Sequence, residues 1–421
     1  MTDIKELVKG IHNCPCGKDH ACPTEAVEIG SGVLPKIIDL CAGYEKILLV
    51  ADQNTYRVCG AEVETLLGAK VEGLVLYQTG DKPLIPNEEA LEKLEAAVTA
   101  NTQLIVGVGS GVINDLCKQV SFVKNLPYYI VATAPSMDGY TSVGSALILK
   151  GMKVTLNARP PKAVIADTKV LQSAPLDMIQ AGVGDILGKH SCLNDWKLSA
   201  LVNGEYFCET VCNLVYEAVD TVGKLTEAAV SRDEAALGAL MEALVAVGFE
   251  MSYVGNSRPA SGSEHHLSHY FEITGILDDA PYFSHGIDVI YSAVVTAAVR
   301  DKVLRTEKPK AFCHDAAAWE AQIRRIYSSS ADEVIKLQKK MGWYDVDGYQ
   351  NVCDKWEAIK AVLATAPTEA EMLEMVKRIG LDYGEFEALY GKEKLHDAIL
   401  YAKDLKDRYT VLWLAYQYCG R

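Results

Sequence analysis

Short apolar runs alternate with segments of helical periodicity between residues 46 and 133, and this alternation limits the folds open to the chain. The apolar runs predict buried strands at 46–51, 71–77, 104–108 and 128–133. The segments between them predict helices at 56–67, 88–98 and 112–125. Strands that alternate with helices form a parallel sheet covered by helices, and such sheets bind ligands at the carboxyl ends of their strands.

The pattern changes near Ser173. Before it, runs at 146–149 and 152–155 flank Lys150-Gly151 and predict a hairpin, and 163–166 predicts one more strand. Beyond it, helical periodicity dominates, as at 232–247 and 291–303. We therefore expect an α/β domain with a parallel sheet at 1–173, an all-helical domain at 174–421, and an active site in the cleft between them. Residues 1–30 form a cysteine-containing N-terminal segment of the first domain.

The charge balance excludes some classes of partner. The 421 residues carry 41 Lys and Arg against 56 Asp and Glu, a formal charge of −15. This field repels nucleic acids and anionic membranes, so we expect neither as a partner. The N-terminus lacks the basic start and apolar stretch of a secretory signal, and no uninterrupted run of 18 apolar residues follows. The sequence predicts a soluble, cytoplasmic protein.

Most of the 12 cysteines are scattered, but Cys14-Pro15-Cys16 and Cys22 form a cluster flanked by His12 and His20. A Cys-x-Cys pair is tighter than the usual zinc-ribbon pair, and no second pair follows nearby. We therefore favour a surface loop with reduced thiols over a metal site, which stays the alternative.

The stretch 107–111, Gly-Val-Gly-Ser-Gly, ends a predicted strand and opens a helix. Backbone N–H groups and the helix dipole at such a point attract an anion, which indicates a pyrophosphate site. A tight turn that needs positive φ angles is the alternative, because the glycines depart from the G-x-G-x-x-G pattern of a first strand. The hydroxyl-rich stretch 133–142 ends the next strand, and Asp52 follows the first, where it could bind a ribose or remain a solvated turn residue.

Histidines provide the sharper signal, since five of the nine lie between residues 190 and 285. His265 and His269 are four positions apart and therefore share one helix face. One histidine of this helix, a distant histidine and a carboxylate would make an open site for a divalent metal. Asp185, in an apolar, glycine-rich segment, is the candidate carboxylate. Histidines with purely structural roles are the alternative.

These motifs, taken together in their order and spacing, resemble the sn-glycerol-1-phosphate dehydrogenase family, and most of all its bacterial branch. The resemblance rests on 109–118, 133–142, 182–185, 257–265 and His285-Gly286. That family belongs to the metal-dependent polyol dehydrogenases, with glycerol dehydrogenase and, more remotely, dehydroquinate synthase. The resemblance covers roughly residues 30 to 300. The N-terminal segment and the last hundred residues carry no matching motif.

The resemblance implies a role for each matched residue. It implies a divalent metal on Asp185, His265 and His285, and substrate contacts by Asp185 and by the catalytic residues His269 and Asp138. It implies a nicotinamide dinucleotide, NAD(H) or NADP(H), held by residues at the strand ends, namely Asp52, Gly109, Ser110, Gly111, Thr133, Ser136 and Ser142. Many relatives have Gly-Gly-Gly where this chain has Gly-Ser-Gly, so the approach of the backbone to the pyrophosphate is expected to differ slightly.

The implied reaction is the reversible reduction of dihydroxyacetone phosphate to sn-glycerol 1-phosphate. Lys189 and Arg258, which flank the metal motifs, are the candidates to bind the phosphate, and His266 is interpreted as structural. Zinc is the first candidate metal, with nickel and iron as alternatives, and a homo-oligomer is expected. The competing interpretations are a glycerol or other polyol dehydrogenase, a lyase of the dehydroquinate synthase kind, and a nucleotide- or metal-sensing module without turnover.

Overall fold

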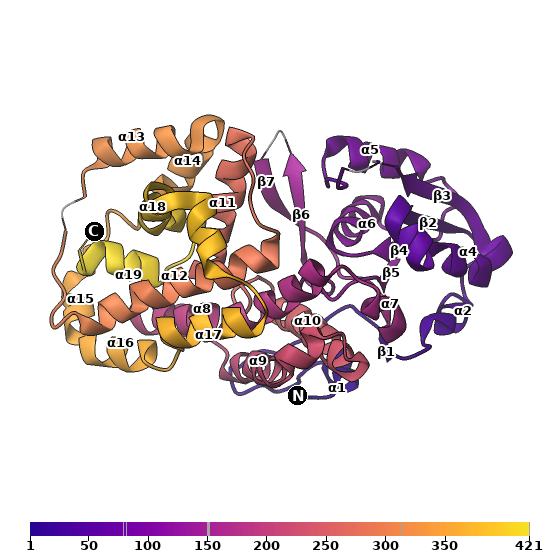
Figure 1. The fold of residues 1–421 in the computed structure, drawn as a ribbon, viewed down its shortest axis with the longest axis horizontal. Helices are drawn as coiled ribbons and strands as arrows, with labels where there is room; N and C mark the ends of the chain where they lie inside the picture. Colours follow the sequence, from indigo (N-terminus) through magenta and orange to yellow (C-terminus); the bar gives the residue numbers. More distant parts are fainter. Residues whose placement is uncertain (79, 81, 150–151, 313, 421) are drawn as a thin grey trace. The chain divides into compact units, whose positions relative to one another are not determined.

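The computed structural model describes residues 1–420 apart from 79, 81, 150, 151 and 313. The chain forms two compact units (Figure 1). The first contains Met1–Ile186 and Asn213–Ser257, and the second contains Leu187–Cys212 and Arg258–Arg421. The change from mixed to helical structure falls near Ser173, but one whole later helix and parts of two others group with the sheet. The domain boundary at 173/174 therefore stays a prediction.

The first unit is built on a sheet of six parallel strands in the order β1-β8-β5-β4-β2-β3. The strands are β1 (Ala26–Gly30), β2 (Ile47–Asp52), β3 (Val71–Tyr77), β4 (Leu104–Gly109), β5 (Tyr128–Ala132) and β8 (Ala163–Asp167). The predicted parallel sheet is confirmed. The edge strand β1, which pairs with β8, was missed because its short run lies within the segment interpreted as a cysteine-containing loop.

The strand order reverses direction at one point. From β2 the chain passes to β3 on one side, and then returns to place β4 on the other side of β2. The strand ends diverge at such a switch point and leave a crevice at their carboxyl ends, where open α/β sheets bind ligands. In this sheet the switch point lies at the carboxyl ends of β2 and β4.

Helices and one hairpin surround the sheet. Helix α6 packs against β2, β4 and β5, the three central strands nearest the switch point. The predicted hairpin is confirmed as β6 (Gly144–Leu149) and β7 (Met152–Asn157), while its turn, Lys150-Gly151, lies outside the described residues. The helices of this part of the chain are α1 (Ile4–Lys9), α2 (Ile37–Leu40), α3 (Gln53–Thr55), α4 (Ala61–Leu67), α5 (Glu88–Ala97), α6 (Gly111–Lys124) and α7 (Thr168–Gln172).

Two helices run from one unit into the other, α8 (Leu176–Asn203) and α9 (Glu209–Val230). Helix α10 (Glu234–Val254) belongs to the first unit and is long and apolar enough to cross a membrane. However, 72% of its most apolar window is buried inside the structure. Because it packs against α1, α7 and β1, its all-round apolar surface is that of a core helix.

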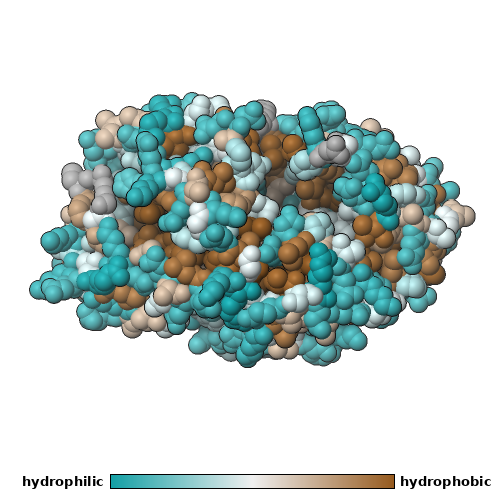
Figure 2. Space-filling view, in the orientation of Figure 1, coloured by the Kyte–Doolittle hydropathy of each residue, from teal (hydrophilic) through white to brown (hydrophobic). Residues whose placement is uncertain are grey.

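The described residues of the second unit form helices and loops without a strand. Helices α11 (Ser263–Asp278) and α12 (His285–Arg305) pack against each other at its centre. Around them lie α13 (Ala316–Tyr327), α14 (Ala331–Met341), α15 (Tyr349–Asp354), α16 (Trp356–Leu363), α17 (Glu369–Arg378), α18 (Tyr383–Tyr401) and α19 (Val411–Tyr418). Hydrophilic side chains cover much of the face drawn in Figure 2.

Candidate functional site

The glycine-rich stretch lies where β4 meets α6. Gly109 is the last residue of β4, and Ser110 is the N-cap of α6, which begins at Gly111. A Cβ at Gly109 would lie 2.6 Å from the Ile113 side chain, so only glycine lets the helix start so close to the strand. Neither Gly109 nor Gly111 has a positive φ angle. Close packing, and not a tight turn with positive φ, therefore explains Gly109.

The carboxyl ends of the two neighbouring strands, β5 and β2, lie beside the end of β4. The Thr133 N–H donates to the Gly109 carbonyl at 3.2 Å, at the end of β5. On the other side, Asp52 ends β2 and caps α3, since its Oδ1 accepts from the Asn54 and Thr55 N–H groups at 2.7 and 2.9 Å. The sheet thus brings Asp52, Gly109 and Thr133 together at its switch point, as the sequence predicted. The capping role of Asp52 is one that the sequence reasoning did not foresee.

The stretch 133–142 packs tightly on helix α8. A Cβ at Gly182 would lie 1.8 Å from the Pro135 carbonyl oxygen, so α8 and this stretch are in direct backbone contact. One helical turn later, the buried Asp185 accepts the Asp138 N–H on its Oδ2 at 3.0 Å. The predicted residues Asp138 and Asp185 are therefore neighbours.

A buried lysine holds the far end of the same stretch. The Lys118 ammonium donates to the carbonyls of Gly139 and Gly144, at 2.6 and 2.9 Å, and to the Ser142 hydroxyl at 3.2 Å. Burial lowers the pKa of Lys118, against the opposing effect of Asp115. Ser142 therefore helps to fix the loop. Within the same stretch, Thr133 is buried and Ser136 is half-buried.

Three histidines gather in the second unit. His265 and His269 lie on α11, and His285 begins α12. Their ring centroids are 6.0 Å (265 to 269), 5.1 Å (265 to 285) and 5.7 Å (269 to 285) apart. His266 is buried away from this triangle, and burial holds its pKa well below the usual range. The predicted pairing of His265 with a distant histidine is present, and His266 has the surroundings of a structural residue.

His265 is fixed in a form that suits a metal ligand. Its Nδ1 lies 2.7 Å from Oε1 of Glu264, which also accepts the Gly262 N–H at 2.9 Å. Burial, with Lys189 and His285 nearby, holds the pKa of His265 well below its usual range, which favours the neutral ring. In that form, an Nδ1–H donated to Oε1 of Glu264 would leave Nε2 as the metal-binding atom. Glu264 escaped the sequence reasoning because its role depends on the adjacent histidine.

A second carboxylate anchors the start of α11. The buried Asp195 accepts the N–H and hydroxyl of Ser263 at 2.7 and 2.6 Å, and the Val411 N–H at 2.7 Å. Burial together with the Asp195 charge raises the pKa of Glu264 to about 8. Asp195 thus joins α8, α11 and α19. In the sequence, the signal that could have revealed its role was an acidic residue inside an apolar helix.

Three cations lie in this part of the second unit, and two of them, Lys189 and Lys406, affect the pKa of His265. Lys189 and Arg258 are both buried, and the Arg258 guanidinium donates to Glu205 at 2.9 Å and to the Tyr409 carbonyl at 2.8 Å. A third cation, Lys406, donates to the Ser261 hydroxyl at 2.9 Å, just before α11. Lys406 could not be found from the sequence because it lies in the last hundred residues, which carry no family motif.

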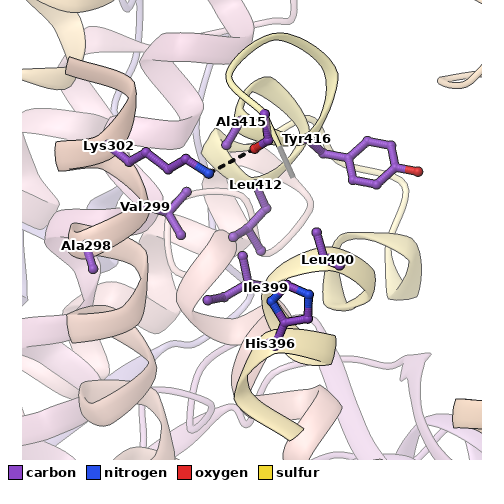
Figure 3. A pocket seen from close by; sticks show the side chains of 10 residues that line it. Ala298, Val299, Lys302, His396, Ile399, Leu400, Leu412, Ala415 and Tyr416 are labelled. Carbon is purple, nitrogen blue, oxygen red and sulfur yellow. Dashed lines mark hydrogen bonds between the residues drawn. The ribbon is translucent and has the colours of Figure 1, made fainter. Parts of the chain in front are cut away.

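A separate hollow in the second unit holds none of these residues. It lies between α12, α18 and α19, with Val299, Ile399 and Leu412 among the side chains that line it (Figure 3). Lys302 at its edge donates to the Gly420 carbonyl at 3.0 Å. This apolar hollow has no convergent set of catalytic groups among the residues that line it.

Comparison with known proteins agrees with the fold and the motifs. Residues 28–175 match the family of iron-containing alcohol dehydrogenases. A sulfoacetaldehyde reductase from Bifidobacterium kashiwanohense, solved in complex with NAD+, is 16% identical with a TM-score of 0.60, over 94% of this chain and 97% of that one. This likeness shows a shared fold and confirms the fold class that the sequence predicted.

Two curated relatives are more similar in sequence. A glycerol-1-phosphate dehydrogenase from Bacillus licheniformis is 30% identical over 99% of this chain and 96% of its own length. The enzyme of the same name from Halalkalibacterium halodurans is 33% identical over 70% of this chain and 76% of its own. The chain therefore belongs to the glycerol-1-phosphate dehydrogenase family, within the iron-containing alcohol dehydrogenase fold.

Proposed function

We propose that this protein reduces dihydroxyacetone phosphate to sn-glycerol 1-phosphate, reversibly, with NADH or NADPH and one divalent metal ion. The observation that carries the proposal is the similarity, over 99% of the chain, to a glycerol-1-phosphate dehydrogenase. The switch point of the sheet and the histidine triangle support the proposal, because the first suits a dinucleotide and the second suits a divalent metal.

The metal ligands that we propose are His265, His285 and Asp185. A Cβ at Gly188 of α8 would lie 2.6 Å from Val289 of α12, so these helices touch there. His285 precedes Val289 by four residues, and Asp185 precedes Gly188 by three. His285 and Asp185 therefore each lie about one helical turn, ~5 Å along the helix axis, from the contact between Gly188 and Val289. Two neutral imidazoles and a buried carboxylate suit zinc, nickel or iron, with zinc the first candidate.

When bound, the metal supplies a Lewis acid for the substrate carbonyl, and the reduced nicotinamide supplies the hydride. Glu264 orients the ring of His265 through the contact at Nδ1. We propose His269, one turn further along α11, as the group that passes a proton to the substrate oxygen, because imidazole titrates near neutral pH. Asp138 is proposed to contact the substrate from the stretch that packs on Asp185.

The dinucleotide is proposed to bind at the switch point of the sheet. The first turn of α6 begins at Gly111 and offers its N–H groups to the pyrophosphate, with Gly109 and Ser110 beside them. Asp52 is proposed to bind the adenosine ribose, and Thr133, Ser136 and Ser142 are proposed to line the rest of the dinucleotide site. A side chain at Ser110 is compatible with this arrangement because Ser110 is the N-cap of α6 and is only half-buried.

The substrate phosphate needs cationic partners. We retain Lys189 and Arg258 as candidates and add Lys406, which lies beside the start of α11 through its contact with Ser261. The guanidinium of Arg258 already joins Glu205 and Tyr409, so we give Lys406 the main role. We also propose that the protein acts in the cytoplasm as a homo-oligomer.

Replacement of the proposed carboxylate ligand tests the metal assignment. In Asp185→Asn, kcat is expected to fall by at least about 10³-fold, because metal polarisation of a carbonyl contributes several kcal/mol. Metal content should fall with it, while NADH affinity changes less. Asp177→Asn, an exposed residue in the first turn of the same helix, is the control. A metal-replete Asp185→Asn enzyme with near-normal kcat would refute the assignment.

A further inference from the structure

The N-terminal segment contains a second group of metal-binding side chains that has no part in the proposed reaction. The thiols of Cys14 and Cys16 and the imidazole of His20 have ligand atoms that all lie within 4.8 Å of one another. Both cysteines are reduced. Cys14 and His20 are buried, with exposed fractions of 5% and 0%, in contrast to the surface loop that the sequence favoured.

The backbone forms a closed loop around these side chains. Ile11 and His20 pair as an antiparallel bridge through two hydrogen bonds, of 2.8 and 2.9 Å. Gly10 has a φ angle of +77°, and a Cβ there would lie 2.4 Å from the His20 carbonyl oxygen. At the tip, the Gly17 N–H donates to the Cys14 carbonyl at 2.9 Å. The loop therefore holds both cysteines and the histidine in place.

His20 has the orientation of a metal ligand. Its Nδ1 lies 3.1 Å from the Tyr253 carbonyl oxygen, at the end of α10, and a carbonyl can only accept. Nδ1 therefore carries a proton, and Nε2, which lies 3.3 Å from the Cys16 sulfur, is the atom left to bind a metal. Histidine ligands of metals commonly donate their other nitrogen to a carbonyl in this way.

The spacing suits a tetrahedral ion. With Zn–S bonds of about 2.3 Å and Zn–N bonds of about 2.0 Å, neighbouring ligand atoms are roughly 3.5–3.8 Å apart. The Cys16–His20 distance of 3.3 Å needs only a small adjustment to reach this value. Soft thiolates with one imidazole select zinc over magnesium or calcium.

We propose that Cys14, Cys16 and His20 bind a structural zinc ion that fastens the N-terminal loop to helix α10. A second contact ties this segment to the same unit, because Glu217 of α9 accepts the Thr2 N–H at 2.8 Å. This site is separate from the proposed catalytic metal, whose ligands include no thiolate.

Cobalt substitution of the full-length protein distinguishes the two sites. Protein produced in cobalt-supplemented medium is expected to show thiolate-to-cobalt charge-transfer absorption, which ligation by histidine and aspartate alone cannot produce. Metal analysis of the zinc-grown wild type should find about two ions per chain, one for each site. Absence of the thiolate–cobalt absorption, together with a single ion per chain, would overturn the proposal and leave the catalytic assignment untouched.

Substitution of single residues identifies the ligands of the proposed N-terminal zinc site. Cys16→Ser and His20→Ala should each lose about one metal ion per chain and the charge-transfer band, while kcat stays within about twofold, because sites that share no partner act nearly independently. Cys22→Ser is the matched control, since Cys22 contacts Thr24 in the same segment, and it should keep both ions. A Cys16→Ser protein that keeps two ions would overturn the proposal.

Discussion

Gly182 offers a direct test of how the site is assembled, because a single methyl group at this position has a calculable effect. In Gly182→Ala, the new Cβ would lie 1.8 Å from the Pro135 carbonyl oxygen, whereas ordinary contacts begin at 3.4 Å. The stretch 133–142 and α8 must then separate by about 1.6 Å, the difference between these two distances.

The expected cost has two parts. Overpacking of this kind destabilises proteins by roughly 1–3 kcal/mol. The separation would also break the hydrogen bond from the Asp138 N–H to Asp185, at 3.0 Å, and a buried hydrogen bond to a charged group contributes about 1.5–3 kcal/mol. The gain from replacing a helical glycine by alanine, about 1 kcal/mol, offsets only part of this. A net loss of about 1.5–5 kcal/mol follows from these estimates.

The assay measures urea-induced unfolding, metal content and the steady-state kinetics of dihydroxyacetone phosphate reduction. We expect lower stability and a kcat/KM reduced by about 10²-fold, because a 1 Å misplacement of reacting groups has that effect. Gly238→Ala is the matched control, since its Cβ on helix α10 would meet Thr168 at an ordinary 3.4 Å, and it should be as stable as the wild type or more so. Wild-type stability and kinetics in Gly182→Ala would refute the reasoning.

Two further substitutions examine the cofactor and phosphate assignments. Gly109→Val should raise the KM for the reduced cofactor more than about tenfold, because its side chain would collide with Ile113 and displace the start of α6. Ser110→Gly should change cofactor affinity less than about tenfold. Fluorescence titration measures the cofactor affinity of both variants, and normal binding by Gly109→Val would contradict the assignment. Lys406→Ala should raise the KM for dihydroxyacetone phosphate by about 10-fold or more, the loss of one charged contact, without altering turnover of unphosphorylated dihydroxyacetone, and equal effects on both substrates would remove Lys406 from the phosphate site.

The sheet could be predicted from the sequence because its central strands are buried on both faces and so appear as continuous apolar runs. Val106 and Ile130, for example, are fully buried. The helix between them was equally clear, since α6 starts at the glycine-rich stretch and ends at Asn125 with a left-handed cap. The edge strand β1 was missed because only Val27 among its residues is buried, so its pattern is not distinct from that of a loop.

The candidate site was predictable where single residue types carry the chemistry. His265, His269 and His285 are rare residues placed close in sequence, and they are close in space as well. Residues that act through a neighbour were not predictable in this way. Glu264 and Asp195 matter only through the groups that they hold, His265 and the start of α11.

The N-terminal cysteines are a case in which sequence reasoning argued against a site that the structure supports. Their spacing argued against a metal site, because no second cysteine pair follows nearby. The third ligand atom comes instead from His20, which the bridge to Ile11 brings back beside Cys16. A bridge between two single residues nine positions apart leaves no periodic signal in a sequence.

The most direct test of the proposed function is the stereochemistry of its product. Purified, metal-replete enzyme is incubated with dihydroxyacetone phosphate and NADH or NADPH, and the glycerol phosphate formed is offered to an enzyme that oxidises only the sn-3 isomer. We predict consumption of the reduced cofactor and a product that the sn-3-specific enzyme does not oxidise. A product that is fully oxidised by it, or turnover of glycerol with no turnover of dihydroxyacetone phosphate, would contradict the proposed function.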